Sequence, residues 1–232
     1  MSAKPAPGIS AIYRMLRGSF GFLNWWPGET KTEIVAGAIL TQQTSWRNVE
    51  RALANLKAAN ALDESSLASM PIGRLEQLVR PSGFYRQKAR RLKAFFEHVE
   101  GSYGTLEAFL SMAQQELRSA LLEMDGIGEE TADSIVLYAA EKPSFVIDAY
   151  TRRAMHRIAG TPEHIGYAEL QGLFERSVRR DVKLYKDMHA QFVELGKRYC
   201  RPKPLCQSCP LNSACMYAHM AQKAPKSHSK KV

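Results

Sequence analysis

The amino-acid sequence predicts an all-α fold. Apolar residues recur at intervals of three and four along most of the chain, as they do on one face of a helix. A polar N-cap residue or a proline stands where several of these patterns begin. No segment combines strict apolar–polar alternation with the turn residues of a β-hairpin. The chain is therefore expected to pack helix against helix.

The expected helices follow in order along the chain. Thr32 is predicted to cap the first, whose apolar residues lie between Ile34 and Ile39. A second runs from Trp46 to Leu56, and Pro71 is expected in the first turn of a third. Further helices are predicted over 85–99, 106–112, 114–124, 129–140, 149–158, 167–178 and 184–199. The helix over 85–99 is expected to be apolar on one face and basic on the other, where it carries Arg86, Lys88, Arg90 and Arg91.

Composition excludes several classes of protein. Apolar residues make up 45% and charged residues 24% of the chain, which is typical of a globular protein. The longest apolar stretch, Ile34–Leu40, is too short to span a membrane. The N-terminal segment lacks the apolar core of a signal peptide. We therefore expect a cytoplasmic, nucleoid-associated protein that has no membrane partner.

The charge balance favours a polyanionic partner. Lys and Arg outnumber Asp and Glu by 32 to 23, which gives a net charge of +9. Such an excess favours nucleic acid, because basic side chains release the counterions condensed on phosphates. Solubility alone is the other explanation, and four of the lysines lie in the last eleven residues. Charge indicates nucleic acid without establishing it.

Four cysteines lie close together near the C-terminal end. They are spaced C-x5-C-x2-C-x5-C and are Cys200, Cys206, Cys209 and Cys215. Core packing does not account for so many neighbouring thiols, and disulfides are not expected without a secretion signal. Structural zinc would use two C-x2-C pairs, whereas the chain has one; a [4Fe–4S] cluster tolerates varied spacing. The spacing favours the cluster and leaves zinc open.

A glycine turn separates two predicted helices near the middle of the chain. Gly126 and Gly128 permit a positive φ and a close approach of the backbone to a ligand. The amides that open the next helix can bind a phosphate without reading the base sequence. An ordinary tight turn is the alternative. The position of Asp148, twenty residues after Gly128, strengthens the first interpretation.

The hairpin, the segment Phe145–Asp148 and the four cysteines, in this order, resemble the helix–hairpin–helix DNA glycosylase superfamily. The cysteine segment is similar to the cluster loop of the endonuclease III-like branch. The resemblance implies a [4Fe–4S] cluster on the cysteines, although the first gap is one residue shorter than usual. It also implies a six-helix barrel over 30–140 and a second lobe from 1–29 and 141–218; composition predicts a basic, disordered tail over 219–232. Double-stranded DNA would bind to a monomer between the lobes, with the damaged nucleotide flipped out.

Individual positions point to a class within the branch. Glu130 replaces the lysine that bifunctional members use, and a carboxylate cannot form an imine. Ala38 stands where adenine-excising relatives carry a catalytic glutamate. The segments Thr41–Thr44, Val79–Tyr85, Gly126–Glu130 and Trp25–Pro27 resemble the 3-methyladenine DNA glycosylases. The expected activity is hydrolytic excision of alkylated purines without lyase chemistry.

The resemblance also implies roles for single residues. Asp148 is the expected catalytic carboxylate, which stabilises positive charge on the sugar or deprotonates water, and it can also cap the next helix. Trp25, Trp26 and Trp46 are candidates to stack on a cationic base, or are core residues. Glu130 at the pocket mouth would further favour a positive base, or is a solvated carboxylate.

Three more residues match positions with known roles in the family. Gln43 matches the residue that fills the gap left by the flipped nucleotide, and Phe84 matches the wedge that intercalates in the opposite strand. Lys197 aligns with a basic residue near the bound base; a lysine that faces solvent or phosphate is nearly as good an interpretation. Two rival functions stay open: a glycosylase for mismatched thymine or uracil, and a non-catalytic DNA-binding iron–sulfur protein.

Overall fold

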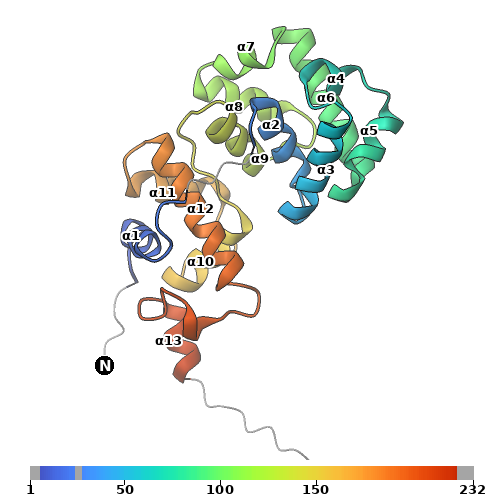
Figure 1. Ribbon diagram of the computed structural model, residues 1–232. Coiled ribbons are helices and arrows are strands. Elements are labelled where there is room, and N and C mark those ends of the chain that lie inside the picture. The colour runs from blue at the N-terminus through green and yellow to red at the C-terminus, as the bar shows by residue number, and fades with distance from the viewer. Residues whose placement is uncertain (1–5, 24–27, 224–232) are drawn as a thin grey trace, which may run out of the picture. The chain divides into compact units, whose positions relative to one another are not determined.

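The protein is helical throughout the part of the chain that the structure describes. The computed structural model describes residues 6–23 and 28–223, without the side chains of 221–223, and these residues contain no β-strand (Figure 1). The predicted all-α class is therefore confirmed. No helix among these residues has both the length and the hydropathy to cross a membrane. The chain divides into two compact units, residues 26–146 and residues 1–25 with 147–232.

The unit of residues 26–146 is built around one long helix, α6. Its elements are α2 (Lys31–Leu40), α3 (Trp46–Ala58), α4 (Glu64–Ser69), α5 (Ile72–Val79), η1 (Arg80–Ser82), α6 (Tyr85–Tyr103), α7 (Leu106–Ser111), α8 (Gln114–Glu123), α9 (Glu129–Ser134) and the π-helical turn η2 (Ile135–Ala139). Helix α6 packs against α2, α4, α5 and α7. Its buried residues Leu92, Phe95, Phe96 and Val99 form the centre of this unit's core.

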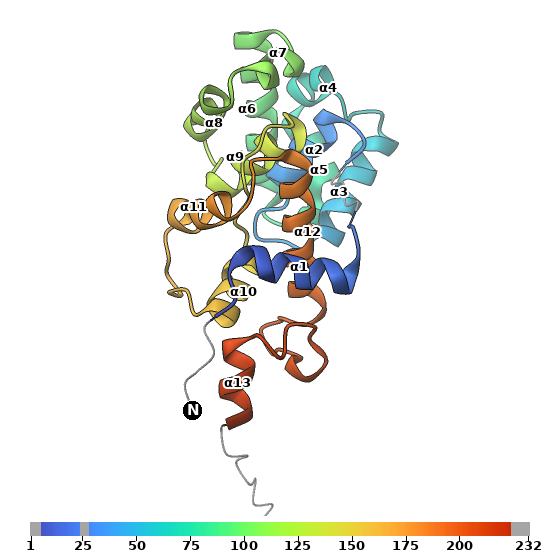
Figure 2. The same ribbon diagram turned by 90° about the vertical axis from the view of Figure 1, so that its left-hand side faces the viewer.

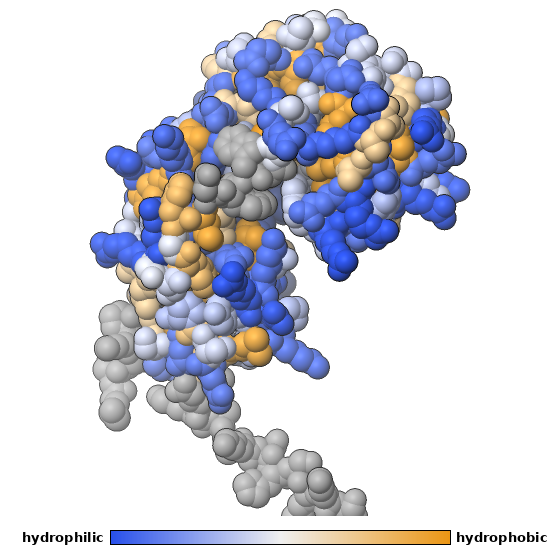
Figure 3. Space-filling model, viewed as in Figure 1, coloured by the Kyte–Doolittle hydropathy of each residue, from blue (hydrophilic) through white to orange (hydrophobic). Residues whose placement is uncertain are grey.

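The other unit is organised by α12. Its elements are α1 (Ile9–Phe20), α10 (Ala149–Ala159), α11 (Tyr167–Ser177), α12 (Val182–Arg198), η3 (Cys206–Ser208) and α13 (Met216–Lys223). Helix α12 contacts both α1 and α10, and Figure 2 shows α1 lying across it. The carboxylate of Asp187 on α12 is buried and accepts hydrogen bonds from Tyr13, Arg17 and the Leu23 amide, which tie the N-terminal segment to this helix. The face seen in Figure 3 is mostly hydrophilic, with isolated apolar areas.

The structure corrects two details of the predicted helices. Helix α2 begins earlier than expected, because Thr30 and not Thr32 is its N-cap and accepts the Glu33 amide. Lys88 does not share the basic face of α6: it is only 2% exposed, and its ammonium donates to the Leu40 and Ser82 carbonyls. Hydropathy placed Lys88 with its basic neighbours, whereas two main-chain carbonyls at the ends of other elements hold it inside.

Several short or terminal helices were not predicted. Helices α1, α4 and α13 and the turn η1 had no assignment from the sequence. Helix α4 is six residues long, so its apolar period is too short to recognise, and it depends on Asp63, whose side chain accepts the Ser66 amide. Residues 219–223 were predicted as disordered tail, and this is wrong, because they belong to helix α13; the rest of that tail lies outside the described residues. The division into a barrel over 30–140 and a second lobe stays a prediction.

Candidate functional site

Two of the four non-glycine residues that have a positive φ in the described chain are predicted site residues. Gln43 follows α2 with φ 52°, and Phe84 precedes α6 with φ 44°. The left-handed region costs a residue with a side chain about 1–2 kcal/mol. Both residues are exposed, and Phe84 keeps 64% of its surface accessible. Strain of this kind is concentrated at functional sites, because only the surrounding structure can maintain it.

The glycine turn between α8 and α9 has two different glycines. Gly126 has φ +75°, and a Cβ there would lie 1.8 Å from Nε of Arg91. Gly128, the N-cap of α9, has φ −90° and nothing within 4 Å of where its Cβ would lie. Gly126 is therefore required by the fold, whereas Gly128 leaves open space in front of the start of α9.

Gln42 connects the α2–α3 loop to this glycine turn. Its Nε2 donates to the Gly126 carbonyl at 2.8 Å and to Oγ1 of Thr131 at 3.2 Å. Its Oε1 accepts a hydrogen bond of 2.8 Å from Nη1 of Arg91. Sequence reasoning used Gln42 only as part of a motif and did not find this bridge, because its partners lie far along the chain.

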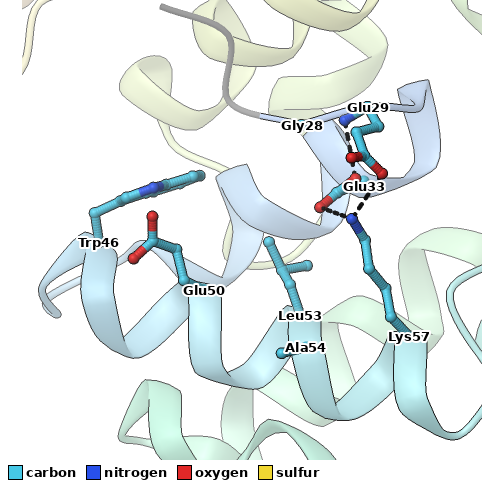
Figure 4. Close-up of a pocket in the computed structure, with 8 residues that line it drawn as sticks. All are labelled: Gly28, Glu29, Glu33, Trp46, Glu50, Leu53, Ala54 and Lys57. Atoms are coloured by element: carbon cyan, nitrogen blue, oxygen red, sulfur yellow. Dashed lines mark hydrogen bonds and ion pairs between the residues drawn. The ribbon is translucent and has the colours of Figure 1, made fainter.

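A cavity of about 460 Å³ lies between α2 and α3, against the indole of Trp46 (Figure 4). Leu53 and Ala54 form its apolar part. The indole packs on Gly37, where an added Cβ would lie 3.4 Å from Cη2 of Trp46. Trp46 is therefore half-buried, and it forms a wall of the cavity and is not enclosed in the core.

Acidic side chains dominate the charge of this cavity. Among the described residues, its lining includes Glu29, Glu33 and Glu50, and a single ammonium, that of Lys57. Lys57 pairs with Glu33 at 2.8 Å and with Glu29 at 3.0 Å, and these hydrogen bonds raise the pKa of Lys57. The carboxylate of Glu50 lies beside the indole of Trp46 (Figure 4). A cavity with an aromatic wall and an acidic lining suits a positively charged planar group.

Four further residues were predicted to contact the base, and the structure describes two of them. Glu130 is exposed in the first turn of α9, and Lys197 is exposed on α12. Trp25 and Trp26 lie outside the described residues. Glu130 and Lys197 belong to different units.

Asp148 is buried at the start of α10. Its Oδ1 accepts the Thr151 amide at 2.7 Å, so the predicted capping role is present. Its Oδ2 lies 3.6 Å from Nε2 of His189, a buried residue of α12. Burial alone would raise the pKa of Asp148, but His189 and Thr151 outweigh it and hold the pKa below its ordinary value. The carboxylate is therefore kept as an anion in an apolar setting.

His189 is a neighbour of Asp148 that sequence reasoning missed. His189 follows Asp148 by 41 residues and lies on a different helix, so the sequence offers no reason to connect the two side chains. The contact between α10 and α12 brings the two side chains together. No local pattern could have shown this pair.

The four cysteines line one cavity in the unit that carries Asp148. Arg157, Tyr199 and Asn212 also contribute to the lining. Nη1 of Arg157 lies 3.6 Å from Sγ of Cys200, and Sγ of Cys215 donates to the Arg157 carbonyl at 3.4 Å. All four thiols are free.

The chemistry of these thiols bears on a metal. The pKa of Cys209 is raised to about 11, chiefly by burial and also by the charge of the three other cysteines, while a hydrogen bond from the Leu211 amide acts in the opposite direction. Four thiolates could share this cavity only with a cation between them. Within the described part of the chain, however, no group of three or more His, Cys, Asp or Glu side chains is arranged to hold a metal ion. The donor set, four neighbouring thiols, is of the kind that binds a metal group.

Comparison with known proteins places the chain in one family. The description "HhH-GPD superfamily base excision DNA repair protein" matches residues 36–180. A Methanocaldococcus jannaschii protein, provisionally named a DNA repair glycosylase, is 44% identical over 210 residues, which are 90% of this chain and 96% of that protein.

Named relatives differ in what they act on. An endonuclease III of Thermotoga maritima is 28% identical over 189 residues, 79% of this chain and 82% of the relative. A thymine-DNA glycosylase of Aeropyrum pernix is 26% identical over 190 residues, 79% and 81% of the two chains. A solved structure of an H. pylori 3-methyladenine DNA glycosylase bound to 1,N6-ethenoadenine has a TM-score of 0.73 and 30% identity, and it covers 83% of this chain and 98% of that one.

Proposed function

Because the chain belongs to the HhH-GPD superfamily and is an endonuclease III-like DNA glycosylase of base excision repair, we propose that it excises alkylated purines by hydrolysis alone. The superfamily and the branch predicted from the sequence are therefore confirmed. The substrate class, the absence of lyase chemistry and the roles of single residues belong to the proposal.

The cavity beside Trp46 carries this proposal. A purine alkylated at N3 or N7 is cationic, and an indole face attracts a desolvated cation by roughly 2 kcal/mol. Glu50 lies beside that indole, and the lining holds three carboxylates and one ammonium. Neutral thymine would gain nothing from this charge. The 30% identity to a 3-methyladenine DNA glycosylase supports the same class.

Asp148 is the proposed catalytic residue. An alkylated purine is already a good leaving group, so positive charge develops on the sugar as the N-glycosidic bond breaks. A buried carboxylate with a lowered pKa is an anion at neutral pH and can stabilise that charge, or take the proton of the attacking water. One oxygen caps α10 and fixes the carboxylate in place. Glu130 stands where bifunctional relatives carry lysine, so the imine route to strand cleavage is excluded there.

The exposed turns are proposed to hold the DNA. Phe84 would insert into the stack opposite the lesion and Gln43 would fill the gap left by the flipped nucleotide. Gly128 would let a phosphate approach the amides at the start of α9, next to Gly126. Trp25, Trp26 and Lys197 are proposed as further contacts to the base.

The cysteines are proposed to hold a [4Fe–4S] cluster. Their common cavity supports a shared metal group, since it brings the four thiols to one place. The ligands would be Cys200, Cys206, Cys209 and Cys215. When bound, the cluster would supply charge neutralisation for four thiolates and a covalent tie for a loop with little core of its own.

A panel of duplexes tests the proposed function. Each carries one lesion: a 3-methyladenine analogue, 7-methylguanine, uracil, mismatched thymine or an oxidised pyrimidine. We expect release of the alkylated purines, without strand cleavage and without covalent capture by borohydride. Release of thymine or uracil but of no alkylated purine would favour the rival that the Aeropyrum relative represents.

A variant tests the cavity itself. Glu50→Gln is expected to slow the release of cationic 7-methylguanine several-fold and to leave the release of neutral 1,N6-ethenoadenine unchanged. Glu123→Gln on α8 is the matched control, since that carboxylate is exposed and does not line the cavity. Equal effects of Glu50→Gln on the two bases would contradict electrostatic selection.

A further inference from the structure

Lys88 is a buried cation that the proposed function does not use. It lies one turn inside α6 and is only 2% exposed. Its ammonium donates hydrogen bonds to two main-chain carbonyls, that of Leu40 at 2.9 Å and that of Ser82 at 2.6 Å. Burying a lysine is costly, and burial lowers the pKa of Lys88 to about 8. The two hydrogen bonds to the carbonyls must offset the cost of this burial, and they fix the positions of those carbonyls.

Each of these carbonyls stands just before a left-handed residue. Leu40 ends α2, three residues before Gln43, and Ser82 ends η1, two residues before Phe84. Gln43 and Phe84 are two of the four non-glycine residues with a positive φ in the described chain. One ammonium therefore connects the bases of two strained, exposed turns that are far apart in sequence.

The same helix makes a second connection one turn further on. Arg91 donates to Gln42, the neighbour of Gln43, and packs against Gly126 of the glycine turn. Lys88 and Arg91 are three residues apart and so lie on one side of α6. The side of α6 that faces the α2–α3 loop thus holds the two strained turns and the glycine turn together.

We propose that Lys88 is a positioning residue that holds the turns of Gln43 and Phe84 at a fixed separation, so that the two side chains can enter one DNA duplex together. The second half of this statement rests on the proposed function, in which both side chains insert into DNA. The first half concerns the free protein and can be tested without DNA.

Hydrogen exchange tests the connection in the free protein. The Thr44 amide donates to Thr41 and the Gly83 amide to Arg80, each at 3.2 Å, so these amides report on the two turns. Lys88→Met keeps the length of the side chain and removes its donors. We expect exchange to become about tenfold faster at both amides, because the local opening free energy falls.

Lys93→Met is the matched control. Lys93 lies on the same helix and also donates to a main-chain carbonyl, that of Ala68 in α4, away from both turns. It should leave Thr44 and Gly83 unchanged. Unchanged exchange at both amides in Lys88→Met, or an equal rise throughout the chain, would overturn the proposal.

Binding to DNA tests the consequence. Lys88→Met is expected to weaken binding to a duplex with an abasic analogue about tenfold, as Gln43→Ala and Phe84→Ala should, because insertion needs both turns. Binding to undamaged duplex should change less than about twofold, since phosphate contacts dominate it. A purely structural lysine would lower both affinities together.

The outcomes separate this proposal from the proposed function. If Gln43→Ala and Phe84→Ala leave the abasic duplex bound normally, insertion fails, and hydrogen exchange still decides the role of Lys88. If Lys88→Met does not fold, Lys88→Gln replaces it, because its amide can still donate to one carbonyl. Faster exchange at Thr44 or Gly83 then supports the proposal, and unchanged exchange at both overturns it.

Discussion

The two units hold their candidate functional residues in opposite ways. In the unit of residues 26–146, Gln43 and Phe84 are exposed on strained turns, and the buried Lys88 of α6 donates to a main-chain carbonyl near the base of each turn. In the other unit, Asp148 is buried and held directly, by the Thr151 amide and by His189. The groups proposed to contact DNA depend on indirect support, whereas the group proposed for chemistry depends on its immediate partners.

The largest expected effect comes from the directly held group. Asp148→Asn keeps the size of the side chain and an oxygen that can cap α10, but removes the negative charge. We expect base release under single-turnover conditions to fall by about 10²–10⁴-fold, with undamaged duplex bound as before.

Asp63→Asn is the control for this substitution, because Asp63 caps α4 in the same way and lies in the other unit. Full activity of Asp148→Asn would remove the catalytic role and would favour a non-catalytic DNA-binding protein on this scaffold.

The cysteine cavity should show the next largest effect, on stability. Cys209→Ala removes one of four proposed ligands, so we expect iron to be lost and the free energy of unfolding to fall by several kcal/mol. Metal analysis of anaerobically prepared protein and thermal unfolding measure both. Zinc in place of iron in the unsubstituted protein would contradict the cluster.

The two glycines of the α8–α9 turn separate folding from binding. Gly126→Ala places a Cβ against Arg91 at a positive φ, so we expect a loss of stability of about 1–3 kcal/mol. The Cβ added by Gly128→Ala contacts no other atom, so this variant should keep its free energy of unfolding but bind duplex DNA more weakly. Equal stability of the two variants, measured by denaturant unfolding, would contradict this distinction.

A smaller effect is expected in the pH dependence. The pKa of Asp148 is lowered in the folded protein, so the active anion is lost only when the pH falls through this lowered pKa. The stability that the anion contributes is complete at pH values above the ordinary carboxylate pKa and is lost over the same fall in pH. His189→Asn removes one cause of this shift. We expect the acid limb of the pH–rate profile to move to higher pH, with little change at neutral pH. An unmoved acid limb would show that His189 does not act on Asp148.

The sequence predicted the fold class, the long helices and the family, but not the individual side-chain contacts. The all-α class and the long helices followed from periodicity, and the family followed from the order of hairpin, Asp148 and cysteines. Three contacts could not be predicted: the burial of Lys88, the bridge made by Gln42 and the pairing of Asp148 with His189. Each includes a contact between residues more than 40 positions apart in the sequence. The cavity beside Trp46 was equally invisible, because its carboxylates come from two helices and the segment before them.

Selection of a cationic purine over a neutral pyrimidine can be measured directly in one experiment. Single-turnover release is compared for two duplexes that differ only in the target, 7-methylguanine or thymine in a mismatch, with the freed base identified by mass. We predict release of 7-methylguanine and an intact strand, with thymine release at least about tenfold slower. Faster release of thymine would show that the protein does not select a cationic purine.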